Sequence, residues 1–362
     1  MLRAMRSLLS WFSLGAVAVA ISGCPKTPAT VATTPTPTPA IAAATPIEVK
    51  IYTSVYREVV DILKEPIDAK LKGQSPAIKV TWVQAGSRKI AARLEEEWAA
   101  GKNEADILLT ADPAFYKKLK ADGKLVAYKS PEAERQSAGY RDPEGYWATA
   151  RFSTMVIGVS PEVEAGMTSP KPASFKDLAD AKGVKRIAMG DPSLSGTTFT
   201  AVATLSKRLG WDYFKDLKKK KALSAGSNST VQQRLDTGES DAGICLLENL
   251  LLAKAGGSKV GVVYPKEGAI VIPGPIALLP HAKDSKPARA VYDAILSVEI
   301  QKILVEKGGM HSADPAMPTP SGAPKLEELL GKETAASIYD PAADSEAIKN
   351  EFIKIFAKAE NK

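Results

Sequence analysis

From residue 47 onward, short apolar runs alternate with amphipathic segments along the chain. Three runs have the length and composition of strands, at residues 47–52 (IEVKIY), 78–84 (IKVTWVQ) and 105–110 (ADILLT). The segments between them, residues 55–71 and 88–100, carry apolar positions at helical spacing, and Pro66 predicts an interruption in the first helix. This order of strand, helix, strand, helix, strand is typical of a mostly parallel sheet.

A second series with the same alternation begins near residue 186. It predicts a strand at 186–189, helices at 197–209 and 230–237, and a strand at 241–246. Extended apolar stretches at 147–160 and 269–279 border this series, and helices at 287–307 and 345–359 follow it. The simplest fold is α/β, with two lobes of mixed, mostly parallel sheet joined by two crossover hinge strands. We expect the first lobe at 47–150, the second at 151–271, and the segment 272–362 returning to the first lobe with its C-terminal helices.

The N-terminus has the three parts of a secretory signal. Two arginines precede an apolar stretch at residues 8–20, which is too short to span a bilayer stably, and small residues follow. Residues 21–24 (ISGC) resemble the lipobox of bacterial lipoproteins, which predicts a signal peptide at 1–23 and a lipid anchor on Cys24. An ordinary signal, cleaved at a small residue, is the alternative. Residues 24–46 are rich in proline, threonine and alanine and predict an extended stalk.

Composition narrows the function classes further. The 362 residues include 48 Lys and Arg against 41 Asp and Glu, and the net charge of +7 falls to +5 without the two arginines of the leader. So weak an excess, without an RNA-binding or helix-turn-helix motif, indicates no nucleic-acid partner. Apart from the leader the chain has no long apolar run, which excludes a polytopic membrane protein.

The few cysteines and histidines limit the chemistry. Cys245 is the single cysteine of the predicted folded body, so we expect no internal disulfide and interpret it as a buried small residue. With only His281 and His311 besides, the chain lacks ligands for a zinc site and a histidine base for nucleophilic catalysis. We therefore expect no metal, no cofactor and no enzymatic activity.

Ligands of open parallel sheets bind at the carboxyl ends of strands, where helix N-termini converge. Four such junctions carry hydroxyl or glycine residues: Thr53 and Ser54; Gly86, Ser87 and Arg88; Ser193, Ser195, Gly196 and Thr197; and Ser227, Asn228, Ser229 and Thr230. Each junction offers backbone N–H groups and the positive end of a helix dipole, so an anion is the natural ligand. Ordinary N-capping by these side chains is the alternative at each junction.

Some candidates have a more specific rationale. Gly196 stands between two hydroxyl residues and removes the Cβ that would obstruct backbone approach to an anion. Arg88 opens a helix, where a cation opposes the helix dipole unless an anion lies nearby. The further candidates lie after the first strand, in the expected hinge and after the 241–246 strand: Tyr56, Glu58, Arg151, Ser153 and Glu248.

Six segments carry a resemblance to a known family: residues 51–58 (IYTSVYRE), 85–95 with 103–109, 150–158, 191–197 (DPSLSGT), 226–241 (GSNSTVQQRLDTGESD) and 264–276 (YPKEGAIVIPGPI). In this order and spacing they resemble the extracellular solute-binding proteins of bacterial ABC importers, in the branch with ferric-ion-, phosphonate- and phosphosugar-binding members. The resemblance covers about residues 47–330. It implies a two-lobed, type II-like periplasmic-binding fold that closes on a small anionic solute and passes it to an ABC permease with its ATPase. We expect an extracytoplasmic monomer held to the membrane by the lipid on Cys24.

The resemblance leaves the ligand open. Ferric-ion-binding members place a tyrosine pair just past the strand that corresponds to residues 241–247, where this chain reads CLLEN at 245–249. Tyr56, Glu58 and Glu248 offer some oxygen ligands, so ferric ion is the alternative to an organic anion such as a phosphonate or a phosphorylated sugar. An exported phosphoesterase is a further alternative, against which stand the missing histidine base and the missing Asp/His metal cluster.

Overall fold

The computed structural model describes residues 45–102, 104–180, 182–339 and 345–356. The predicted signal peptide, the proposed lipidation site Cys24 and nearly all of the stalk lie outside these residues. In the described part of the chain, no helix has the length and apolar character needed to cross a membrane.

The described residues form an α/β fold around one nine-stranded sheet. The strand order is β2-β1-β3-β9-β4-β7-β5-β6, with β8 paired to β4. The strands are β1 (Ile47–Thr53), β2 (Ile78–Gln84), β3 (Ile107–Leu109), β4 (Ala148–Val159), β5 (Ile187–Met189), β6 (Leu223–Ser224), β7 (Ala242–Leu246), β8 (Gly261–Val263) and β9 (Ile270–Leu278). Pairs among β1 to β3 and among β5 to β7 are parallel, whereas every pair that includes β4 or β9 is antiparallel. The predicted mixed sheet is confirmed.

Fourteen helices are present in the described residues, together with three short 3₁₀ turns. The helices are α1 (Arg57–Leu71), α2 (Ser87–Ala99), α3 (Pro113–Ala121), α4 (Pro161–Glu164), α5 (Phe175–Ala179), α6 (Gly196–Leu209), α7 (Trp211–Lys219), α8 (Asn228–Asp236), α9 (Leu247–Ala255), α10 (Lys286–Leu296), α11 (Val298–Glu306), α12 (Leu326–Leu330), α13 (Ala335–Ile338) and α14 (Ser345–Phe356). The 3₁₀ turns are η1 (Glu132–Arg135), η2 (Ala138–Tyr140) and η3 (Pro280–Ala282).

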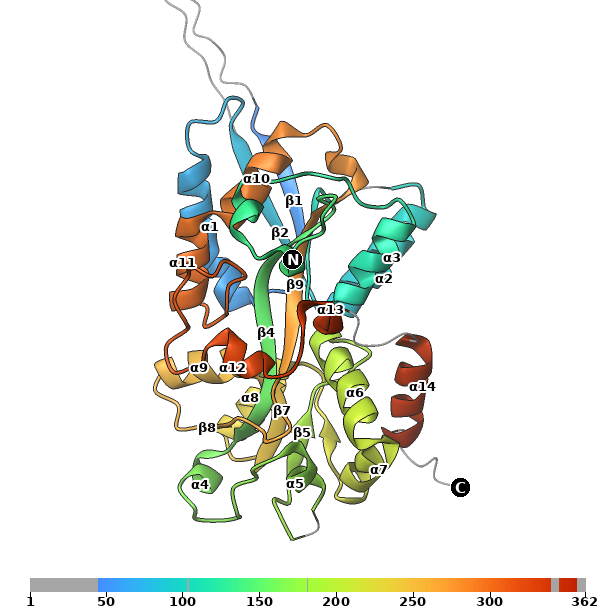
Figure 1. Ribbon diagram of the computed structural model, residues 1–362, viewed down its shortest axis with the longest axis vertical. Coiled ribbons are helices and arrows are strands. Elements are labelled where there is room, and N and C mark those ends of the chain that lie inside the picture. Colours follow the sequence, from blue (N-terminus) through green and yellow to red (C-terminus); the bar gives the residue numbers. More distant parts are fainter. Residues whose placement is uncertain (1–44, 103, 181, 340–344, 357–362) are drawn as a thin grey trace, which may run out of the picture. The chain divides into compact units, whose positions relative to one another are not determined.

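Two long strands connect the two halves of the sheet. Residues 148–155 of β4 pair with β9, while the rest of β4 pairs with β7 and β8. In Figure 1 these strands run lengthwise from the half that holds β1 and β2 to the half that holds β5. We call β1 to β3 with α1 to α3 the first lobe, and β5 to β7 with α6 to α8 the second lobe. The predicted pair of crossover strands is thus present as β4 and β9.

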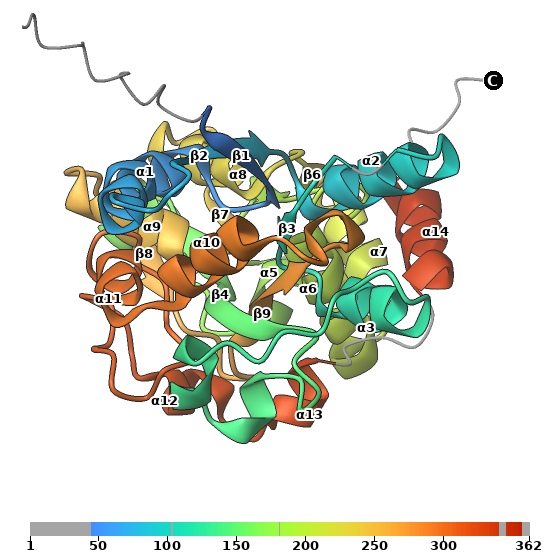
Figure 2. The same cartoon turned by 90° about the horizontal axis from the view of Figure 1, so that it is seen from above.

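Helix α1 continues through Pro66 and ends at Leu71, so the predicted interruption is wrong. Proline removes one backbone hydrogen bond of a helix and strains the preceding turn. Here one face of α1 buries Val59, Leu63 and Ile67 against the core, and α10 and α11 contact the helix. Figure 1 and Figure 2 both show α1, α10 and α11 side by side. This tertiary packing outweighs the cost of the proline.

The segment predicted as one helix at 287–307 is instead two helices that meet at Ser297. Ser297 has extended backbone angles, with φ −64° and ψ 151°, and its hydroxyl donates to the Ala294 carbonyl oxygen at 2.7 Å. Serine hydroxyls that bond nearby backbone in this way compete with the helical pattern. The break lets the buried side chains of Leu296 and Ile300 both reach the first-lobe core.

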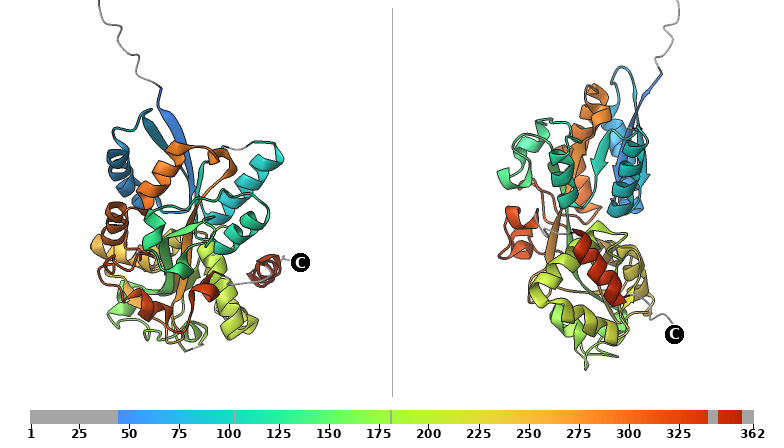
Figure 3. Two further views of the ribbon diagram at one scale, coloured as in Figure 1. Left: turned by 45° about the horizontal axis from the view of Figure 1, so that its top comes forward. Right: turned by 90° about the vertical axis from the view of Figure 1, so that its right-hand side faces the viewer.

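The C-terminal helices divide between the lobes, which corrects the expectation that all of them return to the first lobe. Helices α10 and α11 pack on α1, but α14 contacts α6 and α7 of the second lobe. The Phe352 ring of α14 lies edge-on to Phe214 of α7, with the ring centroids 5.8 Å apart. The right-hand view of Figure 3 shows α14 against the helices of the second lobe.

Candidate ligand-binding cleft

A cavity of about 490 Å³ lies where strand ends and helix N-termini of both lobes meet. It is lined by Ser54, Tyr56, Arg57, Glu58, Gln84, Ala85, Gly86, Ser87, Lys89, Arg151, Ser153, Leu194, Ser195, Thr197, Ser227, Asn228, Ser229 and Leu246. All four predicted junctions therefore contribute residues to one cavity. The crossover strand β4 contributes Arg151 and Ser153.

Hydroxyl and amide groups of the second lobe form a connected network at the cavity. The Asn228 side-chain amide, at the start of α8, donates to the Thr197 hydroxyl at 2.9 Å and to the Ser195 hydroxyl at 3.3 Å. Ser195 also accepts the Thr198 backbone N–H at 3.2 Å, as an ordinary N-cap of α6 does. Capping and cavity lining are thus combined in Ser195. The N-terminal ends of α6 and α8 meet here, which favours negative charge in the cavity.

Arg151 brings a buried positive charge to the cavity. Its side chain is 3% exposed, and its guanidinium donates to the Ser153 hydroxyl. Its Nε has no hydrogen-bond partner, and among the described residues no carboxylate forms an ion pair with it. Burial lowers the pKa of Arg151 from its ordinary value, an effect that the nearby Glu248 partly offsets. A buried cation without a paired anion is costly, so this position favours an anionic ligand.

Two other titratable groups surround Arg151. Tyr56 lines the cavity, and its hydroxyl is buried without a hydrogen-bond partner. Burial, reinforced by the Glu248 charge, raises the pKa of Tyr56 well above its ordinary value, so the phenol is neutral. Glu248 is 1% exposed and accepts the Thr154 backbone N–H at 3.3 Å, and burial raises the pKa of its carboxyl group. Glu248 does not line the cavity, but its charge raises the pKa of Tyr56 and offsets part of the lowering of the pKa of Arg151, and both of these residues do line it.

Arg88, predicted to hold an anion, lies elsewhere. Its Nε is 3.5 Å from the Asp112 carboxylate, and its guanidinium stacks 4.2 Å above the centroid of the Phe199 ring. Asp112 is buried, and a buried carboxylate needs a counter-charge, which Arg88 supplies. The next residue, Lys89, lines the cavity instead. Consecutive helical residues point about 100° apart, so the choice between them depends on the rotation of α2.

Four more predicted residues do not line the cavity. The Thr53 hydroxyl donates to the Leu109 carbonyl oxygen at 2.9 Å and joins two strand ends. The Ser193 backbone N–H donates to Asp191 Oδ1, which stabilises the turn before α6. The Thr230 hydroxyl pairs with that of Ser227 at 2.8 Å. A Cβ on Gly196 would meet Ser87 of the first lobe. The glycine therefore allows α6 to approach the first lobe closely, rather than allowing an anion to approach the backbone.

Sequence reasoning missed six lining residues: Arg57, Gln84, Ala85, Lys89, Leu194 and Leu246. Arg57 and Lys89 are exposed first-turn residues directly beside predicted ones, so including every exposed residue of the first helical turn would have found them. The apolar Leu246 and Leu194 carry no chemical signal of their own. In the described part of the chain, no group of three or more His, Cys, Asp or Glu side chains is placed to hold a metal ion. Cys245 is buried, as predicted, and burial raises the pKa of its thiol to about 12.

The chain belongs to the family of bacterial extracellular solute-binding proteins, whose sequence profile matches residues 56–310. An uncharacterised protein of Haemophilus influenzae is 26% identical over 265 residues, which are 70% of this chain and 75% of that protein. The periplasmic binding protein AfuA of Actinobacillus pleuropneumoniae, solved with fructose-6-phosphate, is 24% identical with a TM-score of 0.75, covering 85% of this chain and 98% of AfuA. Iron-bound HitA of Pseudomonas aeruginosa is 20% identical with a TM-score of 0.72, covering 85% and 99%.

Family membership defines an extracytoplasmic solute-binding protein of the ABC-transporter class, which captures a solute without catalysing a reaction. The expectation of a non-enzyme is confirmed, and the phosphoesterase alternative is wrong. The similar structures confirm the type II periplasmic-binding fold. Because one of them holds a sugar phosphate and the other holds iron, the fold does not select between these two kinds of ligand.

Proposed function

We propose that this protein captures a small organic anion, a phosphonate or a phosphorylated compound, in the cleft between its lobes and delivers it to an ABC permease with its ATPase. The anionic group binds at Arg151, Ser153 and the N-terminal ends of α6 and α8. The serine, threonine and asparagine side chains of the cavity provide further hydrogen bonds. Charge-assisted hydrogen bonds of this kind are the strong ones in protein sites.

The observation that carries this proposal is the state of Arg151. A guanidinium presents five N–H donors in a planar fork that matches carboxylate and phosphate groups. In this protein that fork is buried at the cavity with one hydroxyl acceptor and no ion pair in the described residues. An anionic solute supplies the missing acceptors and offsets the cost of the buried charge.

The same observation weighs against ferric ion. A trivalent cation requires several anionic oxygen ligands, and in the described part of the chain no group of three or more His, Cys, Asp or Glu side chains is placed to hold a metal ion. Arg151 lies close enough to influence the pKa of both Tyr56 and Glu248. A fixed positive charge beside the metal would repel it. Iron is therefore the less favoured ligand.

The cellular setting is part of the proposal. Lipidation of Cys24 and the stalk at 24–46 would hold the monomeric binding domain near the membrane that contains the permease. The segments 47–150 and 272–362 would form one moving unit, with α14 as the exception described above, and 151–271 the other. A solute that contacts both units shifts the open–closed equilibrium toward the closed state.

Calorimetry against a panel of ligands tests the ligand class. The panel contains a phosphonate, a sugar phosphate, inorganic phosphate, a tricarboxylate, ferric ion and the neutral sugar that corresponds to the sugar phosphate. We expect at least one phosphorus-containing anion to bind with a free energy of about −8 kcal/mol, which is micromolar affinity, and the neutral sugar to bind far more weakly. Binding of ferric ion alone, or of no anion, would overturn the proposed ligand class.

A further inference from the structure

The two lobes contact each other directly beside the cleft. The cation in this contact, Arg88, does not line the cavity. The contact joins the N-terminal end of α2 in the first lobe to the N-terminal end of α6 in the second. We define this α2–α6 contact by Gly86, Ser87 and Arg88 on one side and Leu194, Gly196 and Phe199 on the other. We propose that the α2–α6 contact sets the open–closed equilibrium of the cleft, with Arg88 and Phe199 as positioning residues that do not touch the solute. The inference rests on the lobe closure of the proposed function.

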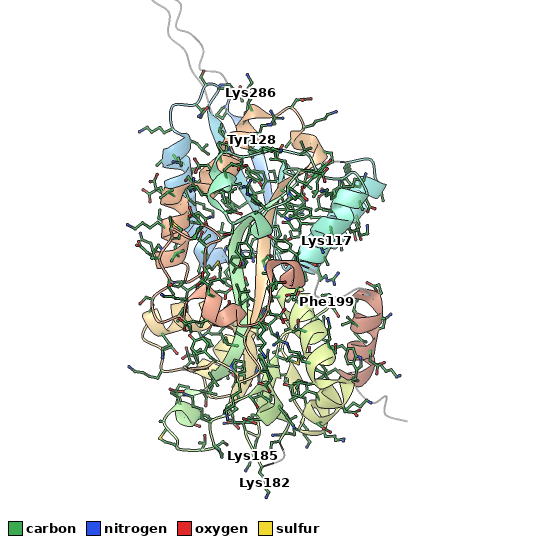
Figure 4. All side chains as sticks on the ribbon, in the orientation of Figure 1. Lys117, Tyr128, Lys182, Lys185, Phe199 and Lys286 are labelled. Atoms are coloured by element: carbon green, nitrogen blue, oxygen red, sulfur yellow. The ribbon has the colours of Figure 1, made fainter. Side chains whose placement is uncertain are left out.

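The first component is the stacking of Arg88 on Phe199. The Arg88 guanidinium carbon lies 4.2 Å from the centroid of the Phe199 ring, within the range of a cation–π interaction. Figure 4 labels Phe199 at the end of α6 that is nearest to α2 and α3. Arg88 belongs to the first lobe and Phe199 to the second, so this interaction is lost when the lobes separate.

The second component holds Arg88 in position. Asp112, between β3 and α3 of the first lobe, is buried and lies 3.5 Å from Arg88 Nε. Because both groups belong to the same lobe, their ion pair persists when the cleft opens. Arg88 is therefore held toward the second lobe before closure, which reduces the side-chain entropy that the stacking would otherwise cost.

The third component is a pair of glycines that let the two backbones meet. A Cβ on Gly86 would overlap the Leu194 carbonyl oxygen of the other lobe. A Cβ on Gly196 would lie 2.8 Å from the Ala111 carbonyl oxygen and 2.8 Å from Ser87 Cβ. Backbone atoms cannot turn aside as a flexible side chain can, so a methyl group at either position would hold the lobes apart. Glycine is thus needed on both sides for the stacking distance to be reached.

The consequence concerns the population of the closed state. Contacts that exist only in the closed state stabilise it whether or not a solute is present, and they slow the release of a bound solute. Weakening the α2–α6 contact should therefore raise the open population in the absence of solute. Neither Arg88 nor Phe199 lines the cavity, so this effect does not act through direct contact with the solute.

Hydrogen–deuterium exchange on the full-length chain without added solute tests the inference. The variants are Arg88→Ala in the first lobe, and Phe199→Leu and Gly196→Ala in the second, with exchange followed in peptides that span residues 86–94 and 195–205. We expect each variant to exchange faster in both peptides, including the peptide of the lobe that carries no substitution. The increase should be about 3- to 10-fold for Arg88→Ala and Phe199→Leu, and larger for Gly196→Ala. In the peptide that spans residues 195–205, the double variant Arg88→Ala/Phe199→Leu should exchange no faster than Phe199→Leu, because the stacking on that lobe is already lost in the single variant.

The matched control is Arg289→Ala, which removes a cation–π interaction with Tyr128. The Arg289 guanidinium carbon lies 5.5 Å from the centroid of the Tyr128 ring, and both residues lie outside the second lobe. This variant should leave both peptides unchanged. Thermal unfolding of each variant verifies that it is folded. Faster exchange confined to the mutated lobe, or additive effects of the double variant in the peptide that spans residues 195–205, would overturn the inference. No solute enters this test, so failure of the ligand panel and failure of the α2–α6 contact are separate results.

Discussion

Arg151 of β4 and Gly274 of β9 are directly paired across the two crossover strands, and the glycine leaves the space that the arginine side chain occupies. A Cβ on Gly274 would lie 3.0 Å from Arg151 Cγ and 3.4 Å from its guanidinium carbon. Contacts this short require the arginine to move. The position of the buried cation is thus set by the register of the hinge, rather than by an ion pair.

The variant Gly274→Ala should therefore weaken solute binding without contacting the solute. The added methyl displaces the Arg151 side chain by a few tenths of an ångström, and hydrogen bonds to an anion depend steeply on such shifts. We expect an affinity for the bound anion about 10-fold lower and a loss of about 1 kcal/mol in the free energy of unfolding. Calorimetry and denaturant titration measure the two effects, and unchanged affinity would show that Arg151 is not held by this packing.

Tyr56→Phe tests whether the unpartnered phenol serves the solute. Removal of a buried hydroxyl without a hydrogen-bond partner should leave the free energy of unfolding unchanged or slightly higher. If the hydroxyl bonds the solute, affinity falls about 10-fold. Tyr213→Phe is the matched control, because the Tyr213 hydroxyl is also buried without a partner but does not line the cavity. Equal affinities of the two variants would exclude the role of Tyr56.

Ser195→Ala separates capping from solute binding. Ser195 and Ser285 both accept a backbone N–H as N-caps, of α6 and α10 respectively, but only Ser195 lines the cavity. Each alanine variant should lower the free energy of unfolding by about 1 kcal/mol. Only Ser195→Ala should also lower the affinity for the anion, by about 5- to 10-fold. Should both variants retain full affinity, Ser195 would be a helix cap and nothing more.

His311 gives the fold a predicted acid sensitivity. It is buried beside the hinge, its backbone carbonyl accepts the Phe152 N–H at 2.8 Å, and its Nε2 lies 2.9 Å from the Pro324 carbonyl oxygen. Burial lowers the pKa of the folded imidazole below the ordinary value of 6.5. The unfolded chain therefore binds the proton more readily, and the free energy of unfolding decreases as the pH falls below about 6.5.

The variant His311→Gln should reduce that decrease while keeping a side-chain N–H donor for Pro324. Denaturant titrations of wild type and variant at pH 7.5 and pH 5.5 give the comparison. The difference in the free energy of unfolding between the two pH values should be smaller for the variant. An identical difference would mean that His311 remains neutral, or is protonated equally, in both states.

The elements that sequence reasoning located well are those with local signals. The apolar runs at 47–52, 78–84 and 241–246 are the strands β1, β2 and β7. Sequence reasoning also predicted that four residues converge on one site, because the carboxyl ends of parallel strands meet at one edge of a sheet. These residues, which line one cavity, are Ser54, Gly86, Ser195 and Asn228.

What could not be predicted depends on contacts between distant residues. Arg88 and Lys89 are equal candidates until Asp112, 24 positions away, fixes which side of α2 faces the first lobe. The sequence shows that α14 has an apolar face, but both lobes offer apolar surfaces to it. Its position on α7 depends on the packing of Phe352 against Phe214, which the local pattern does not predict. The register that places Gly274 beside Arg151 joins strands more than a hundred residues apart. Such pairings carry no signal in a local pattern.

The central claim is that Arg151 binds the anionic group of the solute. A double-mutant-type cycle, which varies both Arg151 and the phosphate group of the solute, tests it most directly. A phosphorylated solute from the panel and its dephosphorylated counterpart are titrated into wild type and into Arg151→Met by calorimetry. In wild type, the phosphorylated form should bind about 100-fold more tightly, as expected for charge-assisted hydrogen bonds. In Arg151→Met most of that preference should disappear; thermal unfolding verifies that the variant is folded, which is needed because the buried Glu248 loses the positive charge of Arg151. An unchanged preference in Arg151→Met, or equal binding of the two solutes by wild type, would contradict the account.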